Sequence, residues 1–112
     1  DIRFPEMYRS LIENGAETIV SCAAWSYPSV EHWNMLNQTR AIENQVNWLT
    51  SSCAGSSGGK NFIGRSMMLD PWGTFVCGSY DKPCVLQAEL EPEKTAEIRE
   101  CFSAVKDIVS FS

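Results

Sequence analysis

Cysteine and histidine are the side chains in this sequence whose chemistry first suggests catalysis. A thiol beside an imidazole can act as nucleophile and base. The chain has one histidine, His32, and five cysteines, Cys22, Cys53, Cys77, Cys84 and Cys101. Cys22 lies inside an apolar run, and Cys53 is distant from His32 in sequence. We therefore interpret His32 as a structural residue at a helix start.

The cysteines also argue against a metal site. Their number is odd, no two form a CxxC pair, and a single histidine cannot complete a zinc set. Cys22 and Cys53 lie in apolar, strand-like runs, where free cysteine behaves as a small hydrophobic residue. We expect reduced core thiols, no metal and a cytoplasmic protein.

Two other stretches resemble catalytic motifs but fail in detail. In "AGSSGGKN", a phosphate loop would need glycine at Ala54 and serine or threonine at Asn61, so we predict a flexible loop instead. Ser66 lacks the flanking glycines of a GxSxG nucleophile elbow. We assign it a structural role.

Hydrophobic periodicity predicts the elements that would position these groups. Pro5 fits the first position of a helix. The run over 17–25 is short and nearly continuously apolar, which predicts a strand buried on both faces. The other expected elements are a helix over 30–46, strands over 48–54, 65–69, 74–78 and 84–90, a turn at 70–73, a loop over 55–61 and a closing helix from Pro92.

Each predicted helix has an apolar side. These sides comprise Phe4, Tyr8, Leu11 and Ile12 on the first helix, Met35, Leu36, Thr39, Ile42 and Val46 on the second, and Thr95, Ile98, Cys101, Phe102 and Val105 on the last. The apolar side of an amphipathic helix packs inward. Arg40, Glu43 and Asn44 share a different face of the second helix, which is free to meet another polar surface.

The order of elements predicts an α/β or α+β layered domain with helices covering a sheet. The 112 residues, with 44% hydrophobic content, suffice for one domain with a single core. The net charge is −5 and the basic residues are scattered, so we expect no nucleic-acid partner. Apolar runs are too short for a membrane span, so we expect no membrane partner. Strands that are apolar on both sides indicate part of a larger sheet.

Five fragments occur in a fixed order along the chain. They are "DIRFPE" at 1–6, "AAW" at 23–25, "HW" at 32–33 with "RAIENQ" at 40–45, "GRSMMLDPWG" at 64–73 and "ELEPEKTAEIRE" at 89–100. Together they resemble the carbon-nitrogen hydrolase family, the nitrilase superfamily, and most closely its amidase and omega-amidase-like branches. The resemblance implies that residues 1–112 are the C-terminal portion of a four-layer αββα sandwich, incomplete in this chain, and that the protein is a homo-oligomer.

The resemblance places the catalytic residues outside this chain. Family members carry CYDxRFPE here, so the nucleophilic cysteine is expected two residues before Asp1, with the general-base glutamate and the lysine further upstream. No catalytic residue is expected within residues 1–112. The family's carboxylate deprotonates the thiol, and the thiolate forms a thioester that water hydrolyses. The implied activity is cofactor-independent hydrolysis of a small amide; the alternative is a non-catalytic binding or assembly module.

The resemblance also suggests which residues surround the substrate. Ala24 and Trp25 end the first strand, where the family lines its pocket, and His32 is expected to shape the rim. Packing in the core is an equally good interpretation of Trp25, whose indole offers a large apolar surface.

Five polar residues are expected to support the site rather than to bind substrate. Arg3 and Glu6 either pair with each other or hold the nucleophile turn. Arg40, Glu43 and Asn44 resemble the family's RAxEN element, for which we favour a bracing network over a solvated helix face.

Overall fold

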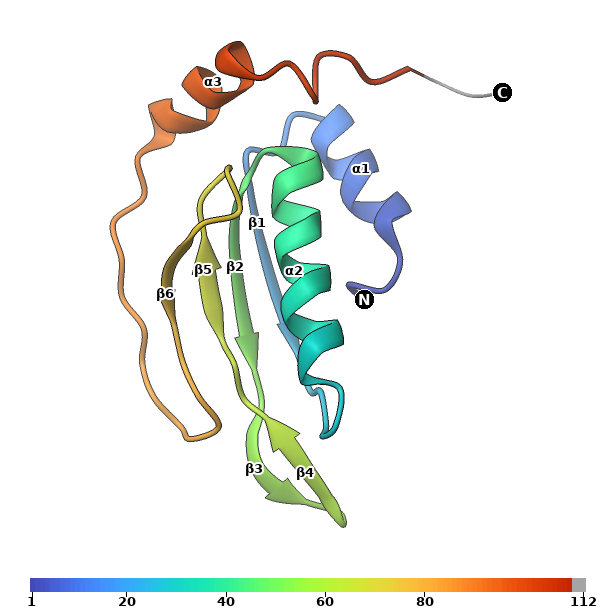
Figure 1. Ribbon diagram of the computed structural model, residues 1–112, viewed down its shortest axis with the longest axis vertical. Helices are drawn as coiled ribbons and strands as arrows, with labels where there is room; N and C mark the ends of the chain where they lie inside the picture. Colours follow the sequence, from blue (N-terminus) through green and yellow to red (C-terminus); the bar gives the residue numbers. More distant parts are fainter. Residues whose placement is uncertain (110–112) are drawn as a thin grey trace.

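The computed structural model describes residues 1–109, which form three helices and six strands (Figure 1). The helices are α1 (Pro5–Glu13), α2 (Val30–Asn44) and α3 (Pro92–Cys101). The strands are β1 (Thr18–Ala23), β2 (Asn47–Ser52), β3 (Ala54–Ser57), β4 (Lys60–Ile63), β5 (Met67–Leu69) and β6 (Phe75–Gly78). Helices packed against a sheet confirm the predicted α/β class. No helix in residues 1–109 is long and apolar enough to cross a membrane.

Four strands form the main sheet in the order β1-β2-β5-β6. β1 and β2 are parallel, with Ala23 opposite Ser52, so their carboxyl ends meet at one edge. β5 is antiparallel to both β2 and β6. The predicted turn at 70–73 is confirmed, because the Gly73 amide donates to the Asp70 carbonyl at 2.8 Å.

The prediction of a flexible loop over residues 55–61 is wrong. β3 and β4 pair there as a separate two-stranded hairpin, at the bottom of Figure 1. Gly58 and Gly59 have φ of 57° and 77°, the positive values that a tight hairpin turn needs and that glycine adopts without strain. The glycines therefore specify a turn.

The prediction of a strand over residues 84–90 is also wrong. The segment runs beside β6 toward α3 in Figure 1, but within residues 1–109 it has no ladder partner. Val85 is 87% exposed. A strand is stable only where neighbours supply hydrogen bonds and cover, and residues 1–109 offer this segment no ladder partner and leave Val85 without cover.

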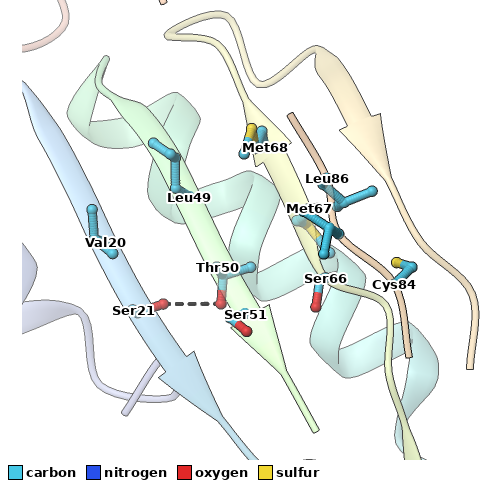
Figure 2. A pocket seen from close by; sticks show the side chains of 11 residues that line it. Val20, Ser21, Leu49, Thr50, Ser51, Ser66, Met67, Met68, Cys84 and Leu86 are labelled. Atoms are coloured by element: carbon cyan, nitrogen blue, oxygen red, sulfur yellow. Dashed lines mark hydrogen bonds between the residues drawn. The ribbon is translucent and has the colours of Figure 1, made fainter. Parts of the chain in front are cut away.

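The sheet face opposite α2, whose side chains Figure 2 draws, is only partly covered by residues 1–109. Val20 is 76% exposed, and its neighbours across the sheet, Leu49 and Met68, are half-buried. A cavity of about 290 Å³ lies between this face and residues 84–86. β1, predicted to be buried on both faces, is therefore buried on one, because the helices lie on one side.

Cys22 and Cys53 are exposed, so the prediction of core thiols at these positions is wrong. Cys22 lies two residues after Val20 and shares its uncovered face of β1. Cys53 lies between the last residue of β2 and the first of β3, where the chain leaves the main sheet. An apolar run around a cysteine does not bury it when the strand has one covered face.

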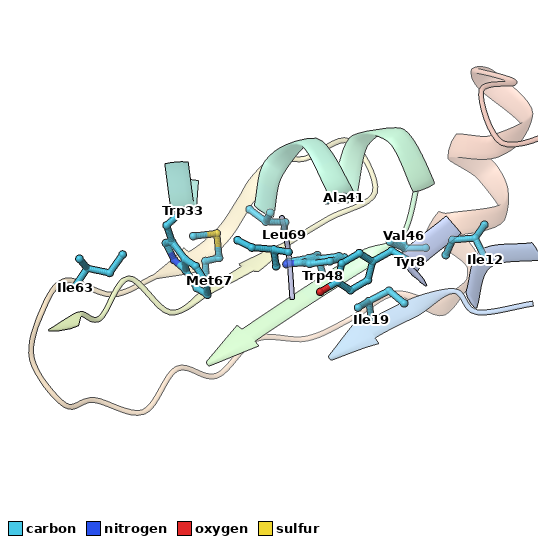
Figure 3. Packing of buried hydrophobic residues seen from close by; sticks show 11 residues of the cluster. Tyr8, Ile12, Ile19, Trp33, Ala41, Val46, Trp48, Ile63, Met67 and Leu69 are labelled. Atoms are coloured by element: carbon cyan, nitrogen blue, oxygen red, sulfur yellow. The ribbon is translucent and has the colours of Figure 1, made fainter. Parts of the chain in front are cut away.

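The core lies between the opposite face of the sheet and the helices (Figure 3). Trp33 of α2, Trp48 of β2, and Met67 and Leu69 of β5 are each at most 2% exposed. Tyr8 packs edge-on against Trp48, with ring centroids 5.0 Å apart, and this contact joins α1 to the layer. Burial of such large side chains stabilises the fold by about 1.5–3 kcal/mol each.

α2 turns a different face toward the sheet from the one predicted. Met35 and Ile42, on the predicted apolar side, are 66% and 50% exposed, and Val46 is buried but lies beyond the end of the helix. The buried positions of α2 are Trp33, Asn37, Arg40, Ala41 and Asn44. Polar side chains are buried here because they find hydrogen-bond partners, as the site shows.

The other two helices follow their predicted apolar sides in part. The predicted residues that are buried are Tyr8 and Ile12 on α1 and Thr95 and Ile98 on α3. Those that are exposed are Phe4, Leu11, Cys101 and Phe102. α3 ends at Cys101, so the later positions lie outside the helix.

Candidate functional site

A cleft of about 410 Å³ lies at the carboxyl end of β1. Its lining residues are Asp1, Arg3, Ala24, Trp25, Ser26, Ser29 and His32. The structure thus brings the three predicted substrate-binding residues to one place, beside the segment that precedes α1. An adjoining groove of about 470 Å³ shares Asp1, Ala24 and Trp25 with the cleft.

The loop that carries Trp25 is held by the β4 strand. The Ile63 amide donates to the Trp25 carbonyl at 2.9 Å, and the Tyr27 amide donates to the Asn61 carbonyl at 2.9 Å. Ser26 forms a bridge with Phe62 between these two bonds. The β3–β4 hairpin, which we predicted to be a loop, therefore fixes the backbone of residues 25–27 in the cleft wall.

Trp25 combines the two roles that the sequence left open. It is half-buried, lines the cleft, and also packs against the buried core cluster. Its ring centroid lies 5.6 Å from that of Trp33, with the planes at 49°. Lining the cleft and packing in the core are compatible, and contact with substrate stays a prediction.

His32 lies in the first turn of α2, where it is exposed and lines the cleft. Cys22 lines the adjoining groove and is absent from the cleft lining that contains His32. This placement gives no support to a Cys22–His32 pair. Within residues 1–109, no group of three or more His, Cys, Asp or Glu side chains could hold a metal ion.

Arg40 reaches from α2 to the chain segment that borders the cleft. Its side chain is 7% exposed; Nε donates to the Ile2 carbonyl at 3.0 Å and Nη2 donates to the Arg3 carbonyl at 3.4 Å. Nη1 pairs with the Glu43 carboxylate at 3.2 Å. The Asn44 side chain donates to the Arg40 carbonyl at 2.9 Å. Arg40 thus connects Asn44 and Glu43 to the backbone beside Asp1.

Arg3 and Glu6 do not pair within the described residues. The Arg3 guanidinium instead pairs with the Asp1 carboxylate at 2.5 Å, and Glu6 is exposed on α1. Spacing of three residues brings side chains together only inside a helix, and α1 begins at Pro5, after Arg3. The spacing argument for a pair between Arg3 and Glu6 therefore does not apply, because Arg3 lies before the helix.

Buried hydrogen bonds connect Trp48 of β2 with Asn37 and Trp33 of α2, three residues to which the sequence assigned no role at the site. Trp48 Nε1 donates to Asn37 Oδ1 at 2.7 Å, and Asn37 Nδ2 donates to the Trp33 carbonyl at 2.8 Å. The indole N–H of Trp33 donates to the Arg65 carbonyl at 2.8 Å. Spacing of four residues places Asn37 on the Trp33 face, but a buried asparagine has no sequence signal of its own.

Tyr8 packs against Trp48, one of these residues. Burial raises the pKa of its hydroxyl above the ordinary value, and the positive charge of Arg40 offsets part of the rise. The rise follows from the position of Tyr8 in the core, where it is 3% exposed.

Ser66 has structural contacts. Its hydroxyl accepts a hydrogen bond from the Ser52 amide, and its amide donates to the Ser79 hydroxyl, both at 2.9 Å. Gly64, at φ 65°, has no room for a side chain, because a Cβ there would lie 2.2 Å from the Tyr80 carbonyl oxygen. These residues join the strands and do not line the cleft.

Comparison with known proteins identifies the family. The family described as "Carbon-nitrogen hydrolase" matches residues 1–100. The 2-oxoglutaramate amidase of Bacillus subtilis is 36% identical over 108 residues, covering 96% of this chain and 42% of that protein. A deaminated glutathione amidase of Synechocystis is 34% identical over 102 residues, covering 89% and 38%. The chain thus spans about two fifths of the length of these curated relatives.

Solved structures agree with this assignment. Nit3 of Saccharomyces cerevisiae, a member of branch 10 of the nitrilase superfamily, is 30% identical with a TM-score of 0.85, covering 91% of this chain and 38% of that one. XC1258 of Xanthomonas campestris has a TM-score of 0.91 at 24% identity, over 100% of this chain and 45% of that one, and shows the fold alone. This chain belongs to the carbon-nitrogen hydrolase family, in the amidase-like part of the nitrilase superfamily.

Proposed function

We propose that this chain is the C-terminal portion of an amidase that hydrolyses small amides, or related C–N bonds, through a cysteine thioester. The cysteine, the glutamate base and the lysine lie upstream of Asp1 in this proposal. The observation that carries it is the cleft in which Ala24, Trp25 and His32 meet the segment beginning at Asp1. The names of the two amidase relatives support an amide as substrate.

Each part of the cleft has a use in this reaction. Attack of the thiolate on the amide carbon gives a tetrahedral oxyanion, and its rate depends on holding the nucleophile at the right place. Arg40 fixes the carbonyls of Ile2 and Arg3, next to the proposed position of the nucleophile. Trp25 supplies an apolar wall for the acyl group, and His32 supplies a polar rim.

The test uses the full-length protein, including the sequence upstream of Asp1. We expect ammonia release from small linear amides such as 2-oxoglutaramate, and loss of activity when the cysteine two residues before Asp1 becomes alanine. Cys22→Ser is the matched control and is expected to retain activity, since Cys22 lies outside the cleft. A folded full-length protein that releases no ammonia from any amide would favour the binding or assembly module instead.

A further inference from the structure

Trp25 lines the cleft, and a second tryptophan, Trp33, packs behind it in the core. Trp33 is 0% exposed and lies beside Met67 between α2 and the sheet (Figure 3). Trp25 is half-buried, and its ring packs against Trp33 with centroids 5.6 Å apart. The inner ring therefore supports the outer one.

Trp33 is fixed at both its backbone and its ring. The Asn37 side chain donates to its carbonyl, and its indole N–H donates to the Arg65 carbonyl, both at 2.8 Å. Arg65 has φ of 59°, an uncommon value for a residue with a side chain, and its amide donates to the Tyr80 carbonyl at 2.9 Å. The Arg65 carbonyl accepts from the Trp33 indole, and the hydrogen bond from the Arg65 amide to Tyr80 holds this residue in place.

Trp25 is fixed at its backbone only. Its carbonyl accepts from the Ile63 amide, but none of the hydrogen bonds recorded for residues 1–109 involves its indole N–H. The orientation of the Trp25 ring therefore depends on what it packs against. Trp33 is the aromatic ring in contact with it.

We infer that Trp33 is a positioning residue, which sets the orientation of the Trp25 indole and through it the length of acyl group that the cleft accepts. This inference rests on the proposed amidase function. Loosening a wall alters the binding of groups that reach it far more than the chemistry at the reacting carbon.

The first test compares acetamide with hexanamide as substrates of the full-length enzyme. Trp33→Phe is expected to raise KM for hexanamide about tenfold while kcat, and KM for acetamide, change less than about twofold. Trp48→Phe is the matched control. Trp48 is also 0% exposed and donates its indole N–H to Asn37 of α2, but its ring packs against Tyr8 and not against Trp25. Equal changes of KM in both variants would overturn the inference.

A double-mutant cycle asks whether Trp33 acts through Trp25. In a Trp25→Ala background, Trp33→Phe is expected to leave the preference between the two amides unchanged within about twofold, because the ring that it positions is gone. A tenfold change of the preference between the two amides in that background would overturn the inference, because Trp33 would then act on the substrate without Trp25.

A spectroscopic readout separates this inference from the proposed function. In protein containing 5-fluorotryptophan, the ¹⁹F signal lost on Trp25→Phe is expected to shift in Trp33→Phe and to stay in place in Trp48→Phe. An unmoved signal would overturn the inference. Absence of turnover in the wild type would reject the amidase, while the ¹⁹F spectrum would still decide the positioning role.

An isostere covers the case in which Trp33→Phe does not fold. Benzothienylalanine at position 33 keeps the ring size but lacks the N–H that donates to the Arg65 carbonyl. The same shift of the Trp25 signal is expected, and its absence would show that the hydrogen bond does not set the ring.

Discussion

On α2, the face turned toward the sheet carries Asn37, Arg40 and Asn44, all buried, whereas the face turned away carries Met35 and Ile42, at least half exposed. Burying a polar group costs free energy unless the group finds a partner. The two asparagines each donate to the carbonyl four residues earlier, and Arg40 donates to carbonyls near the start of the chain. Hydrogen bonds to these carbonyls offset part of the cost of burying the donor groups of this face.

The largest expected effect is at Arg40. Arg40→Met keeps most of the apolar stem but leaves the Ile2 carbonyl without its donor at 3.0 Å. We expect a loss of about 2–4 kcal/mol in the free energy of unfolding of the full-length protein. Urea unfolding followed by circular dichroism measures it.

Glu43→Gln is the control for this change. It removes the charge that pairs with Arg40 but leaves the contact between Arg40 and Ile2 in place. We expect it to cost less than about 1 kcal/mol, because the Glu43 side chain is 30% exposed. If Arg40→Met cost as little, other contacts would hold the segment before α1.

Asn37→Leu comes next. It leaves the buried indole N–H of Trp48 without its acceptor at 2.7 Å and is expected to lower the free energy of unfolding by about 1–3 kcal/mol. Asn34→Leu, the same change at a half-buried position of α2, is expected to cost less than about 0.5 kcal/mol. Equal costs would mean that the hydrogen bond between Trp48 and Asn37 adds nothing to the free energy of unfolding.

The comparison of the two faces also shows what the sequence could predict. The five ordered fragments predicted the family, and the α/β class followed from the order of elements. The partner of Arg40 on the buried face of α2 was not predictable, because the carbonyl that Arg40 binds belongs to Ile2, 38 residues away in sequence. Periodicity reports residue types along a helix and contains no information about distant acceptors.

The errors at the sheet have different causes. The Gly58–Gly59 pair is a hairpin signal that was interpreted as flexibility, so the β3–β4 hairpin was predictable. Residues 84–90 have the alternation of a strand, but pairing depends on a neighbour that residues 1–109 do not supply. The family resemblance placed Ala24, Trp25 and His32 at the pocket, whereas the contact between Trp25 and Trp33 has no sequence signal.

The burial of Tyr8 predicts a pH dependence of stability. Because burial raises the pKa of Tyr8, the unfolded chain ionises first as the pH rises above about 10. The stabilising contribution is complete below that pH and is lost as the pH approaches the raised pKa, by at most about 1.4 kcal/mol per pH unit. Unfolding of wild type and Tyr8→Phe at pH 9 and 11 measures it, and parallel slopes would show that Tyr8 is hydrated.

The smallest effect is expected on the exposed face of α2, which carries Met35 and Ile42. Met35 is 66% exposed, so Met35→Gln removes little buried apolar surface and is expected to change the free energy of unfolding by less than about 0.5 kcal/mol, at any protein concentration. Leu69→Gln is the reference variant: Leu69 has 0% exposure, so a polar side chain there is expected to lower the free energy of unfolding much more than Met35→Gln. A cost at Met35 that grows with protein concentration would mean that a second subunit covers this face in the predicted homo-oligomer, because unfolding would then be linked to dissociation. The two faces of α2 would in that case both be buried, the inner one by this chain and the outer one by its partner.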